Sequence, residues 1–469
     1  MKIDALFIHP PYASEEVYGS LLKASGVFPP LGISYLASCL EEEGYKVRIN
    51  DYDADGVKPE DSIKRYNPTV VAISATSPVF RQAIRIAKIA KEEGCTTMIG
   101  GPHPTATPKA TINNSCFDYL VYGEGENTIR DLMNSLEKNG DLKKVDGIFY
   151  KEKNKIVRTK PRKLIEDIDT IPFPAYHLLP MKKYRFYAFF DTGIGFSTML
   201  TNRGCPFGCI FCNTRTIFGS SLRFRSPKKI LDEVELVYNK YKVKDIYFYD
   251  DALTLSRKHV EGFCNEMKKR KIDLKWSTET RVDKVDFELL DLMKKSGCYM
   301  VGYGFESADQ KILNNLKKGT TIEQNAKAVK ATRKTGMICR GFFMLGSPGE
   351  TVTTMSKTIN FSIKNKVDFA HFNITTPYPG TPLWDMGVKE GKLKPEDAEN
   401  TGAIANVLAN KKIIGSELSS KTVKKYWKKA NLKFYLRPWF IYNLLKRIEN
   451  HHHLKRTLEA SIGFFLGGL

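Results

Sequence analysis

The chain of 469 residues is long enough for two or three domains, and its 42% hydrophobic and 27% charged residues are typical of a soluble globular protein. No stretch approaches the ~20 apolar residues of a membrane-spanning helix, and Pro10 and Pro11 break the apolar start too early for a signal peptide. Nine cysteines without a paired framework favour a reducing cytoplasm, and the net charge of +21 favours a nucleic acid, a membrane surface or an anionic substrate as partner.

Strands and helices alternate through the first part of the chain. Apolar runs predict strands at 5–9, 46–51, 70–74, 97–100 and 119–121, and helical periodicity predicts helices at 31–43, 80–93 and 127–136. This alternation indicates an α/β fold with a doubly wound, Rossmann-like parallel sheet, which we assign to residues 1–145. Ligands bind such sheets beyond the carboxyl ends of the strands.

Small, glycine-rich loops follow three of these strands. The candidate binding residues in these loops are Ser74, Thr76, Gly100, Gly101, His103, Gly123 and Glu124. A glycine pair after a strand is by itself more often a tight turn than a cofactor cradle. The loops are therefore candidates for a binding site, with the tight turn as the alternative.

A connector is expected at residues 146–190. It contains a predicted hairpin at 147–160, with its turn at Lys153 and Asn154, and a stiff proline-rich segment at 171–176. The alternation resumes at 191–395, where strands are predicted at 197–202, 245–249, 274–279, 300–305, 341–345 and 370–375. Six such units indicate a partial (βα)6 TIM barrel, whose chemistry is expected at the carboxyl ends of its strands.

Three cysteines, Cys205, Cys209 and Cys212, share one loop after the first barrel strand with the spacing C-x3-C-x2-C. Three soft thiolates from one short loop suit an iron–sulfur cluster. A [4Fe–4S] cube needs four ligands, so three leave one iron open for a substrate or cosubstrate. A zinc site is the main alternative, but zinc prefers four closed ligands, and the remaining cysteines are scattered singly.

This loop resembles the signature of the radical S-adenosylmethionine (SAM) superfamily, including the aromatic Phe211 before the last cysteine. The resemblance implies that the open iron chelates SAM and that reductive cleavage of SAM gives a 5′-deoxyadenosyl radical. It also implies that Phe211 lies against the adenine, and that a flavodoxin- or ferredoxin-type reductase is the electron donor.

The ends of later strands resemble further SAM-binding motifs of that family. Asp250 stands where the family contacts the SAM amino group, although a helix N-cap is an equal alternative. Arg281 is a candidate partner for the SAM carboxylate. Glu306 and Ser307 resemble the ribose contact, and Gly346 belongs to a segment that resembles the adenine motif.

The N-terminal loops resemble the cobalamin-binding domain that precedes many radical SAM domains. The segments that carry this resemblance are Pro-Pro-Leu-Gly at 29–32, Gly-Gly-Pro-His at 100–103 and Gly-Glu-Gly-Glu at 123–126. The motif D-x-H-x-x-G, whose histidine ligates cobalt, is missing from the first loop, which reads His-Pro-Pro-Tyr-Ala-Ser from His9. We therefore expect base-off cobalamin without an axial histidine, with an empty, degenerate domain as the alternative.

Residues 396–469 are predicted to form a basic, aromatic and helical tail. Residues 411–469 carry 13 Lys and Arg against 3 Asp and Glu, and aromatic residues recur beside them at helical spacing, notably over 432–448. This pattern favours a helix in a membrane interface, and helices packed on the barrel with a solvated basic face are an equal alternative. The three adjacent histidines at 451–453 are expected to be solvated, because they cannot all face one ion on a helix.

The tail also resembles that of the branch that contains anaerobic Mg-protoporphyrin monomethyl ester cyclase and the hopanoid and bacteriochlorophyll C-methylases. We predict a cobalamin-dependent radical SAM enzyme that acts on an unactivated carbon of a lipophilic substrate, foremost as a C-methyltransferase. Ring formation or another oxidation without methyl transfer is the alternative, and a non-enzymatic cobalamin sensor would leave the cysteine loop without a purpose. Nucleic acid is disfavoured, since neither cysteines for a second cluster nor a terminal β-barrel is evident. The expected location is the cytoplasm, with peripheral contact of the tail to the inner face of the membrane.

Overall fold

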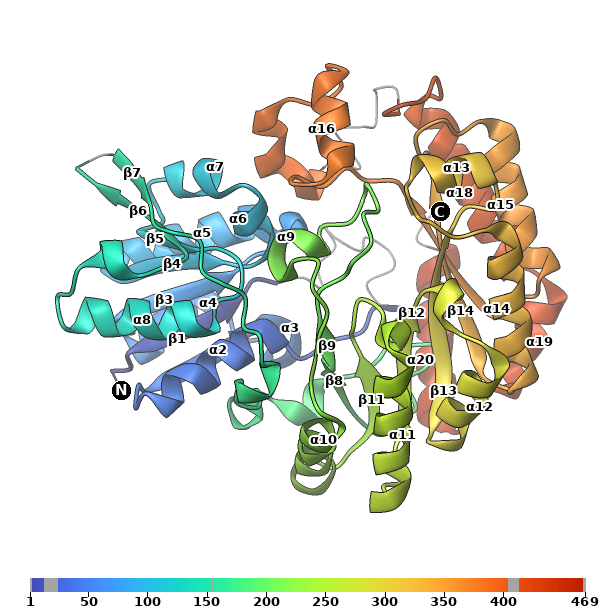
Figure 1. The fold of residues 1–469 in the computed structure, drawn as a ribbon, viewed down its shortest axis with the longest axis horizontal. Coiled ribbons are helices and arrows are strands. Elements are labelled where there is room, and N and C mark those ends of the chain that lie inside the picture. Colours follow the sequence, from blue (N-terminus) through green and yellow to red (C-terminus); the bar gives the residue numbers. More distant parts are fainter. Residues whose placement is uncertain (1, 12–23, 154, 404–412, 467–469) are drawn as a thin grey trace.

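Two parallel β-sheets organise the chain, one in each half, and they stand side by side in Figure 1. The computed structural model describes residues 2–11, 24–153, 155–403 and 413–466. Loops at the carboxyl ends of strands from both sheets line one cavity between the two halves.

The N-terminal sheet has seven strands in the order β2-β1-β3-β4-β5-β6-β7. They are β1 Ala5–His9, β2 Val47–Asp51, β3 Val70–Ser74, β4 Thr96–Gly100, β5 Tyr119–Val121, β6 Ile148–Glu152 and β7 Lys155–Arg158. The first five run parallel, as predicted. The hairpin β6–β7, which the sequence placed in the connector, pairs antiparallel with β5 and extends this sheet.

Helices cover both faces of the N-terminal sheet, which is the predicted doubly wound arrangement (Figure 1). They are α2 Leu31–Glu42, α3 Tyr52–Asp55, α4 Pro59–Tyr66, α5 Phe80–Glu92, α6 Pro102–Ala106, α7 Pro108–Asn113 and α8 Glu126–Glu137. Helices α2 and α8 bury Ile33, Leu40 and Leu132 in one apolar cluster. Helices α4 and α5 bury Ile63 and Phe80 in another. With both faces covered, the ends of the strands are the place left for a ligand.

The second sheet is a half-barrel of six parallel strands in the order β15-β14-β13-β12-β11-β8, which confirms the predicted partial barrel. The strands are β8 Gly195–Met199, β11 Val243–Phe248, β12 Lys275–Thr280, β13 Cys298–Glu306, β14 Ile338–Leu345 and β15 Phe369–Ile374. The helices after them are α10 Pro227–Tyr241, α11 Arg257–Arg270, α12 Phe287–Lys295, α13 Gln310–Asn315, α14 Ile322–Lys334, α15 Val352–Lys364 and α16 Pro382–Lys389. Phe248, Phe263 and Trp276 pack edge to face between strands and helix α11, with ring centroids 5.1 to 5.6 Å apart.

The predicted first barrel strand, 197–202, is wrong at its end. Strand β8 stops at Met199, and the chain turns into β9 Asn202–Arg203, which pairs antiparallel with β10 Arg223–Phe224 in a separate two-stranded sheet. A distant residue holds this turn, because the backbone N–H of Thr201 donates to Asp250 Oδ1 at 2.7 Å. Along the sequence, the segment that carries the three cysteines lies between strand β9 and helix α9 Thr214–Phe218.

Three helices form the part of the tail that follows residue 413, which confirms the predicted helical tail: α18 Ser420–Tyr435, α19 Pro438–Lys446 and α20 His451–Leu466. Pro438 begins α19, because proline suits the first helical turn and disfavours helical backbone in the residue before it. Helix α18 packs on β15, where Trp427 Nε1 donates to the carbonyl of Phe372 at 2.6 Å. No helix in the described part of the chain has the length and apolar character needed to cross a bilayer. Residues 467–469 of the apolar end lie outside the described residues.

Candidate active site

The cysteine loop, residues 205–212, presents three thiols together. Cys205 and Cys209 are half-buried and Cys212 is exposed, whereas the other six cysteines are all buried. A turn joins the last two, since the N–H of Cys212 donates to the carbonyl of Cys209 at 3.2 Å. Burial raises the pKa of the Cys205 and Cys209 thiols. Three reachable thiols on one short loop fit a cluster that takes three protein ligands and leaves one iron open.

Two cations lie beside the cysteine loop. The guanidinium of Arg281 stacks 3.5 Å from the ring centroid of Phe207, and its Nε donates to Asp283 at 2.9 Å. The ammonium of Lys318 donates to Glu306 Oε1 at 2.8 Å and lies 6.0 Å from the Phe211 ring centroid. Burial alone would lower the pKa of Lys318, but the negative charges of Glu306 and Cys209 and the hydrogen bond to Glu306 together raise that pKa.

The predicted residues Phe211, Arg281 and Glu306 thus gather around the cysteines. Lys318, which completes the group, was missed, because its only sequence signal is a lysine after a helix. Glu306 has a φ of +57°, a left-handed conformation that is uncommon for a residue other than glycine. Such strain clusters at functional sites, and here it aims the carboxylate at Lys318.

Ser307 and Gly346 support the barrel rather than face an opening. Ser307 is fully buried, and its hydroxyl pairs with that of Thr358 at 3.2 Å. The N–H of Gly346 donates to Glu350 Oε2, which also accepts from the N–H of Ser347 at 2.8 Å. Burial raises the pKa of Glu350 to about 7. These contacts stabilise the loop after β14. They occupy the N–H of Gly346, so a contact of this glycine with SAM would have to use another backbone atom.

Asp250 has a supporting role, and its neighbour Asp251 faces the opening. Asp250 Oδ1 accepts from the N–H groups of Thr201 and Asn202, at 2.7 and 3.0 Å, and Oδ2 accepts from the Thr201 hydroxyl at 2.8 Å. Burial raises the pKa of Asp250 to about 7. Asp251 is exposed and bonds the Thr214 hydroxyl at 2.7 Å, two residues beyond Cys212. At this strand end Asp251, and not the predicted Asp250, has the carboxylate that is accessible to a ligand.

A cavity of about 580 Å³, the cofactor cavity, opens between the two halves. Six of the seven predicted N-terminal residues line it: Ser74, Thr76, Gly100, Gly101, Gly123 and Glu124. Tyr187, Tyr249 and Asp251 line it from the barrel side.

The wall of the cofactor cavity leaves a hydroxyl and stretches of glycine backbone open to a ligand. The Thr76 hydroxyl is buried and finds no hydrogen-bond partner among the described residues. A Cβ on Gly123 would meet nothing within 4 Å, so this glycine faces open space. A Cβ on Gly101, whose φ is +98°, would lie 2.8 Å from the Ser74 hydroxyl. An orphaned hydroxyl and side-chain-free backbone are consistent with a bound cobalamin.

His103 is not among the described residues that line this cavity, so its predicted contact with the cofactor stays a prediction. It is buried on helix α6, where its ring packs 4.0 Å from the centroid of Phe80 and its Nδ1 lies 3.0 Å from the Ser77 hydroxyl. Burial lowers the pKa of His103 to about 4, so the imidazole is neutral. At the start of helix α6 the side chain of His103 points toward Phe80 and the apolar cluster to which Phe80 belongs.

A histidine–carboxylate group that the sequence analysis missed lies at the ends of β1 and β2. Nδ1 of His9 is 3.6 Å from Oδ1 of the buried Asp51, whose Oδ2 accepts from the Tyr184 hydroxyl at 2.8 Å. The possible ligand atoms of His9, Asp51 and Asp53 all lie within 4.8 Å of one another. Burial opposes the charged imidazole, but Asp51 outweighs it and raises the pKa of His9. His9 and Asp53 line the cofactor cavity.

Glu124 joins the two halves through buried ion pairs. It accepts from Arg203 at 2.9 Å and from Arg223 at 2.7 Å, and Glu126 pairs with the other end of Arg203. All four side chains are at most 8% exposed. We call these four residues the clamp. Since the arginines lie on β9 and β10, the clamp ties the N-terminal loops to the ribbon that brackets the cysteine loop.

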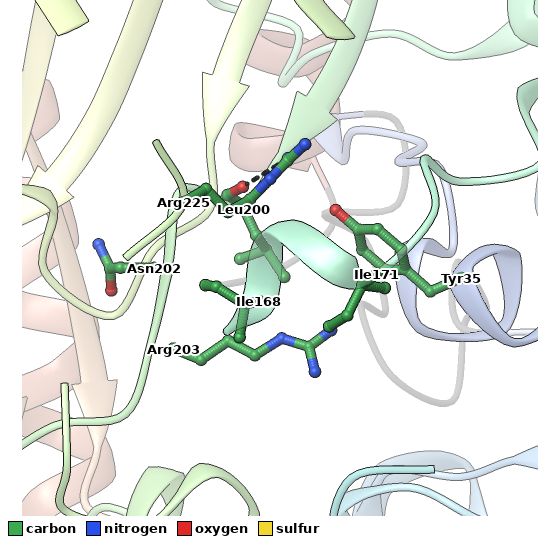
Figure 2. Close-up of a pocket in the computed structure, with 7 residues that line it drawn as sticks. All are labelled: Tyr35, Ile168, Ile171, Leu200, Asn202, Arg203 and Arg225. Carbon is green, nitrogen blue, oxygen red and sulfur yellow. Dashed lines mark hydrogen bonds between the residues drawn. The ribbon is translucent and has the colours of Figure 1, made fainter. Parts of the chain in front are cut away.

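A second, very small cavity beside the clamp is shown in Figure 2, where Tyr35, Arg203 and Arg225 lie around Ile168 and Ile171. Arg225 Nη1 donates to the carbonyl of Leu200 at 3.1 Å. The volume of about 10 Å³ is that of a single water, so this is a packed junction and not a ligand site.

Comparisons with known proteins agree with this division of the chain. Residues 19–133 match the B12 binding domain, and residues 199–362 match the Radical SAM superfamily. The chain is 37% identical, over 98% of both sequences, to an uncharacterized methyltransferase of Pyrococcus horikoshii. It is 30% identical to the anaerobic magnesium-protoporphyrin IX monomethyl ester cyclase of Rubrivivax gelatinosus, over 97% of this chain and 81% of that one.

A solved structure has the same fold. The chain is similar to the cobalamin-dependent S-adenosylmethionine radical enzyme OxsB with a TM-score of 0.73 and 17% identity, over 97% of this chain and 72% of that one. At that identity the likeness is one of fold, and it extends over both sheets and the helices that follow.

Proposed function

Because the chain belongs to the B12-binding radical SAM enzymes, we propose that it is a C-methyltransferase that acts on an unactivated carbon of a lipophilic small molecule. A [4Fe–4S] cluster, SAM and cobalamin, when bound, supply the radical and methyl-transfer chemistry. The observation that supports the proposal most is the cofactor cavity, which residues of both halves line together. Holding both cofactors and a substrate in one enclosure replaces collisions by a fixed geometry.

The residues of the candidate site, which lie at the cysteine loop and on the cavity wall, have distinct roles in this proposal. The three cysteines hold the cluster, and Arg281 and Lys318 offset its negative charge. Asp251 is a candidate acceptor for the ammonium of SAM, and Glu306 for the ribose hydroxyls. The clamp keeps the two walls of the cavity together and excludes water from the junction.

Labelled SAM tests the proposal. The reconstituted enzyme, supplied with reductant and a membrane-lipid extract, should transfer a deuterated methyl group from SAM, and mass spectrometry should find one extract component with the added label. The 37% identity to a methyltransferase supports this outcome. The 30% identity to a cyclase supports the alternative, ring formation or oxidation, in which the product carries no label. An unlabelled, oxidised product would contradict methyl transfer.

Cobalamin is proposed to bind base-off, without an axial histidine. The first loop lacks the motif that supplies such a ligand, and its residues 12–14 lie outside the described residues. His9 is the histidine on the cavity wall, with Nδ1 turned to Asp51, which makes it the residue to test. Electron paramagnetic resonance of bound cob(II)alamin should show no nitrogen splitting in the wild type or in His9→Ala. Splitting that His9→Ala removes would make His9 the ligand and contradict the proposal.

The tail helices, α18 to α20, are proposed to contact the membrane peripherally. Leu436, Tyr442 and Leu445 are 52%, 64% and 60% exposed, among many lysines and arginines. Apolar side chains beside cations suit an interface with anionic lipid. Deleting the tail would strip the core of Val423 and Phe434, which are fully buried, so point variants are needed.

Replacing these three side chains by serine should weaken co-sedimentation with phosphatidylserine vesicles, whereas Ile156→Ser on the distant hairpin should not. Equal sedimentation of both variants would leave the tail as a packing element.

The electron donor is proposed to be a flavodoxin- or ferredoxin-type reductase. The net charge of +21 on this chain would attract an acidic partner of that type.

A further inference from the structure

Glu279 is a carboxylate of the half-barrel to which the proposed cofactor contacts assign no role, although it is close enough to Asp251 and Glu306 to affect their charges. It lies near the carboxyl end of β12, and its side chain is 34% exposed. Its neighbours Tyr247 and Arg340 are only 1% and 2% exposed. A carboxylate that is partly exposed among buried neighbours is a candidate contact for a ligand.

One oxygen of Glu279 is held and the other is available. Tyr247 donates its hydroxyl to Oε1, and Nη1 of Arg340 lies 3.9 Å from the same atom. Among the described residues, no hydrogen bond reaches Oε2. Gly302 stands between the two charged residues on β13, and a Cβ there would lie 3.0 Å from Glu279 Cγ. The carboxylate therefore has its place because the intervening residue has no side chain.

Arg340 supports a charged carboxylate rather than a closed ion pair. Its guanidinium lies 4.7 Å from the ring centroids of both Tyr187 and Phe342. Its Nε and Nη1 find no hydrogen-bond partner in the described part of the chain. Burial raises the pKa of Glu279, whereas the charge of Arg340 at 3.9 Å and the hydrogen bond from Tyr247 act against this shift and favour the ionised carboxylate.

Aromatic side chains form the walls next to Glu279. The ring of His371 stacks on Phe342 with centroids 5.3 Å apart, and Tyr187 lies 6.3 Å from His371. Burial, aided by Arg340, lowers the pKa of His371, so its ring is neutral. All three rings are half-buried. Tyr187 also lines the cofactor cavity, so these walls adjoin that cavity through Tyr187.

We propose that Glu279 binds a hydrogen-bond-donating group, a hydroxyl or an amine, on an otherwise apolar substrate whose body lies against Tyr187, Phe342 and His371. The proposal rests on the proposed function for the presence of an apolar substrate. It adds that the substrate carries a polar donor, and that Glu279 selects it. A buried, anchored carboxylate discriminates strongly, because an analogue without the donor leaves the charge unpaired.

A fluorescent polyene chain with four different end groups tests this inference. Protein reconstituted with its cluster and cobalamin is titrated with the alcohol, the amine, the methyl ester and the carboxylate. The wild type should bind the alcohol and the amine at least about tenfold more tightly than the other two, the size of one charge-assisted hydrogen bond. Glu279→Gln should lose this preference while binding the ester as before, and Glu152→Gln, an exposed control on β6, should keep it.

The ester titration separates a lost contact from a lost fold. Glu279→Gln also leaves the buried charge of Arg340 without its carboxylate partner. Glu279→Asp, which keeps a carboxylate, is therefore the second variant. It should retain part of the preference for the alcohol and the amine. An unchanged preference in Glu279→Gln, tightest binding of the carboxylate, or no binding of any probe would overturn the proposal. The assay contains neither SAM nor reductant, so failure of methyl transfer and failure of this site are observed separately.

Discussion

The substitution Glu124→Gln tests whether the clamp holds the two halves together. Glu124 is 3% exposed and neutralises two arginines that are 6% and 7% exposed. After the substitution Arg203 keeps Glu126, but Arg223 keeps only the carbonyls of Ile165 and Phe218. A guanidinium is thereby left in a buried site without a carboxylate.

Removing one partner of a buried ion pair costs about 3–5 kcal/mol. Because the amide still accepts hydrogen bonds and two carbonyls remain, we expect the lower end, about 3 kcal/mol, in urea unfolding followed by circular dichroism. Glu152→Gln is the control, since its partner Lys143 is 3.8 Å away and both are more than half exposed. It should change the unfolding free energy by less than about 0.5 kcal/mol. A loss below about 1 kcal/mol for Glu124→Gln would refute the reasoning.

Three further predictions concern the cofactors and the pH. Cys209→Ala should abolish the visible absorbance of the reconstituted cluster and all SAM cleavage, whereas Cys116→Ala, in the N-terminal core, should leave both; retained cleavage would remove the cluster assignment. Gly101→Ala should weaken cobalamin binding about tenfold in an absorbance titration, because its Cβ would meet Ser74 and Ala75 in the cavity wall. Gly44→Ala, with a similar positive φ and nothing within 4 Å, should lose stability but no affinity, and equal losses of affinity would contradict the steric account. Glu350 has a pKa raised by burial from 4.5 to about 7, so its contribution to stability is present below pH 4.5 and is lost as the pH rises through 7. The loss is about 3 kcal/mol at most, and it should be absent from urea unfolding of Glu350→Gln measured between pH 5 and 8.

Local patterns predicted the strands of both sheets, because each is an apolar run between glycine, proline or polar residues. The end of β8 was missed because Asp250, about fifty residues away, determines where the chain turns. The helical spacing over 432–448 predicted the helical character of the tail, and Pro438 divides that range between α18 and α19.

The site followed the same division. The cysteine spacing and the glycine loops are local, and the structure brings six of the seven N-terminal residues to one cavity. The roles of His103, Asp250 and Glu124 depend on which partners the fold supplies: Phe80 for the first, Thr201 for the second, and two arginines of the other half for the third. Such partners have no signal in a single sequence.

Methyl transfer is tested most directly by product stoichiometry. The reconstituted enzyme receives cobalamin, reductant, SAM and a membrane-lipid extract under anaerobic conditions, and 5′-deoxyadenosine and S-adenosylhomocysteine are quantified together. A methyltransferase that uses one SAM for the radical and one for the methyl group produces both in equal amounts. Formation of 5′-deoxyadenosine alone would contradict methyl transfer and favour ring formation or oxidation.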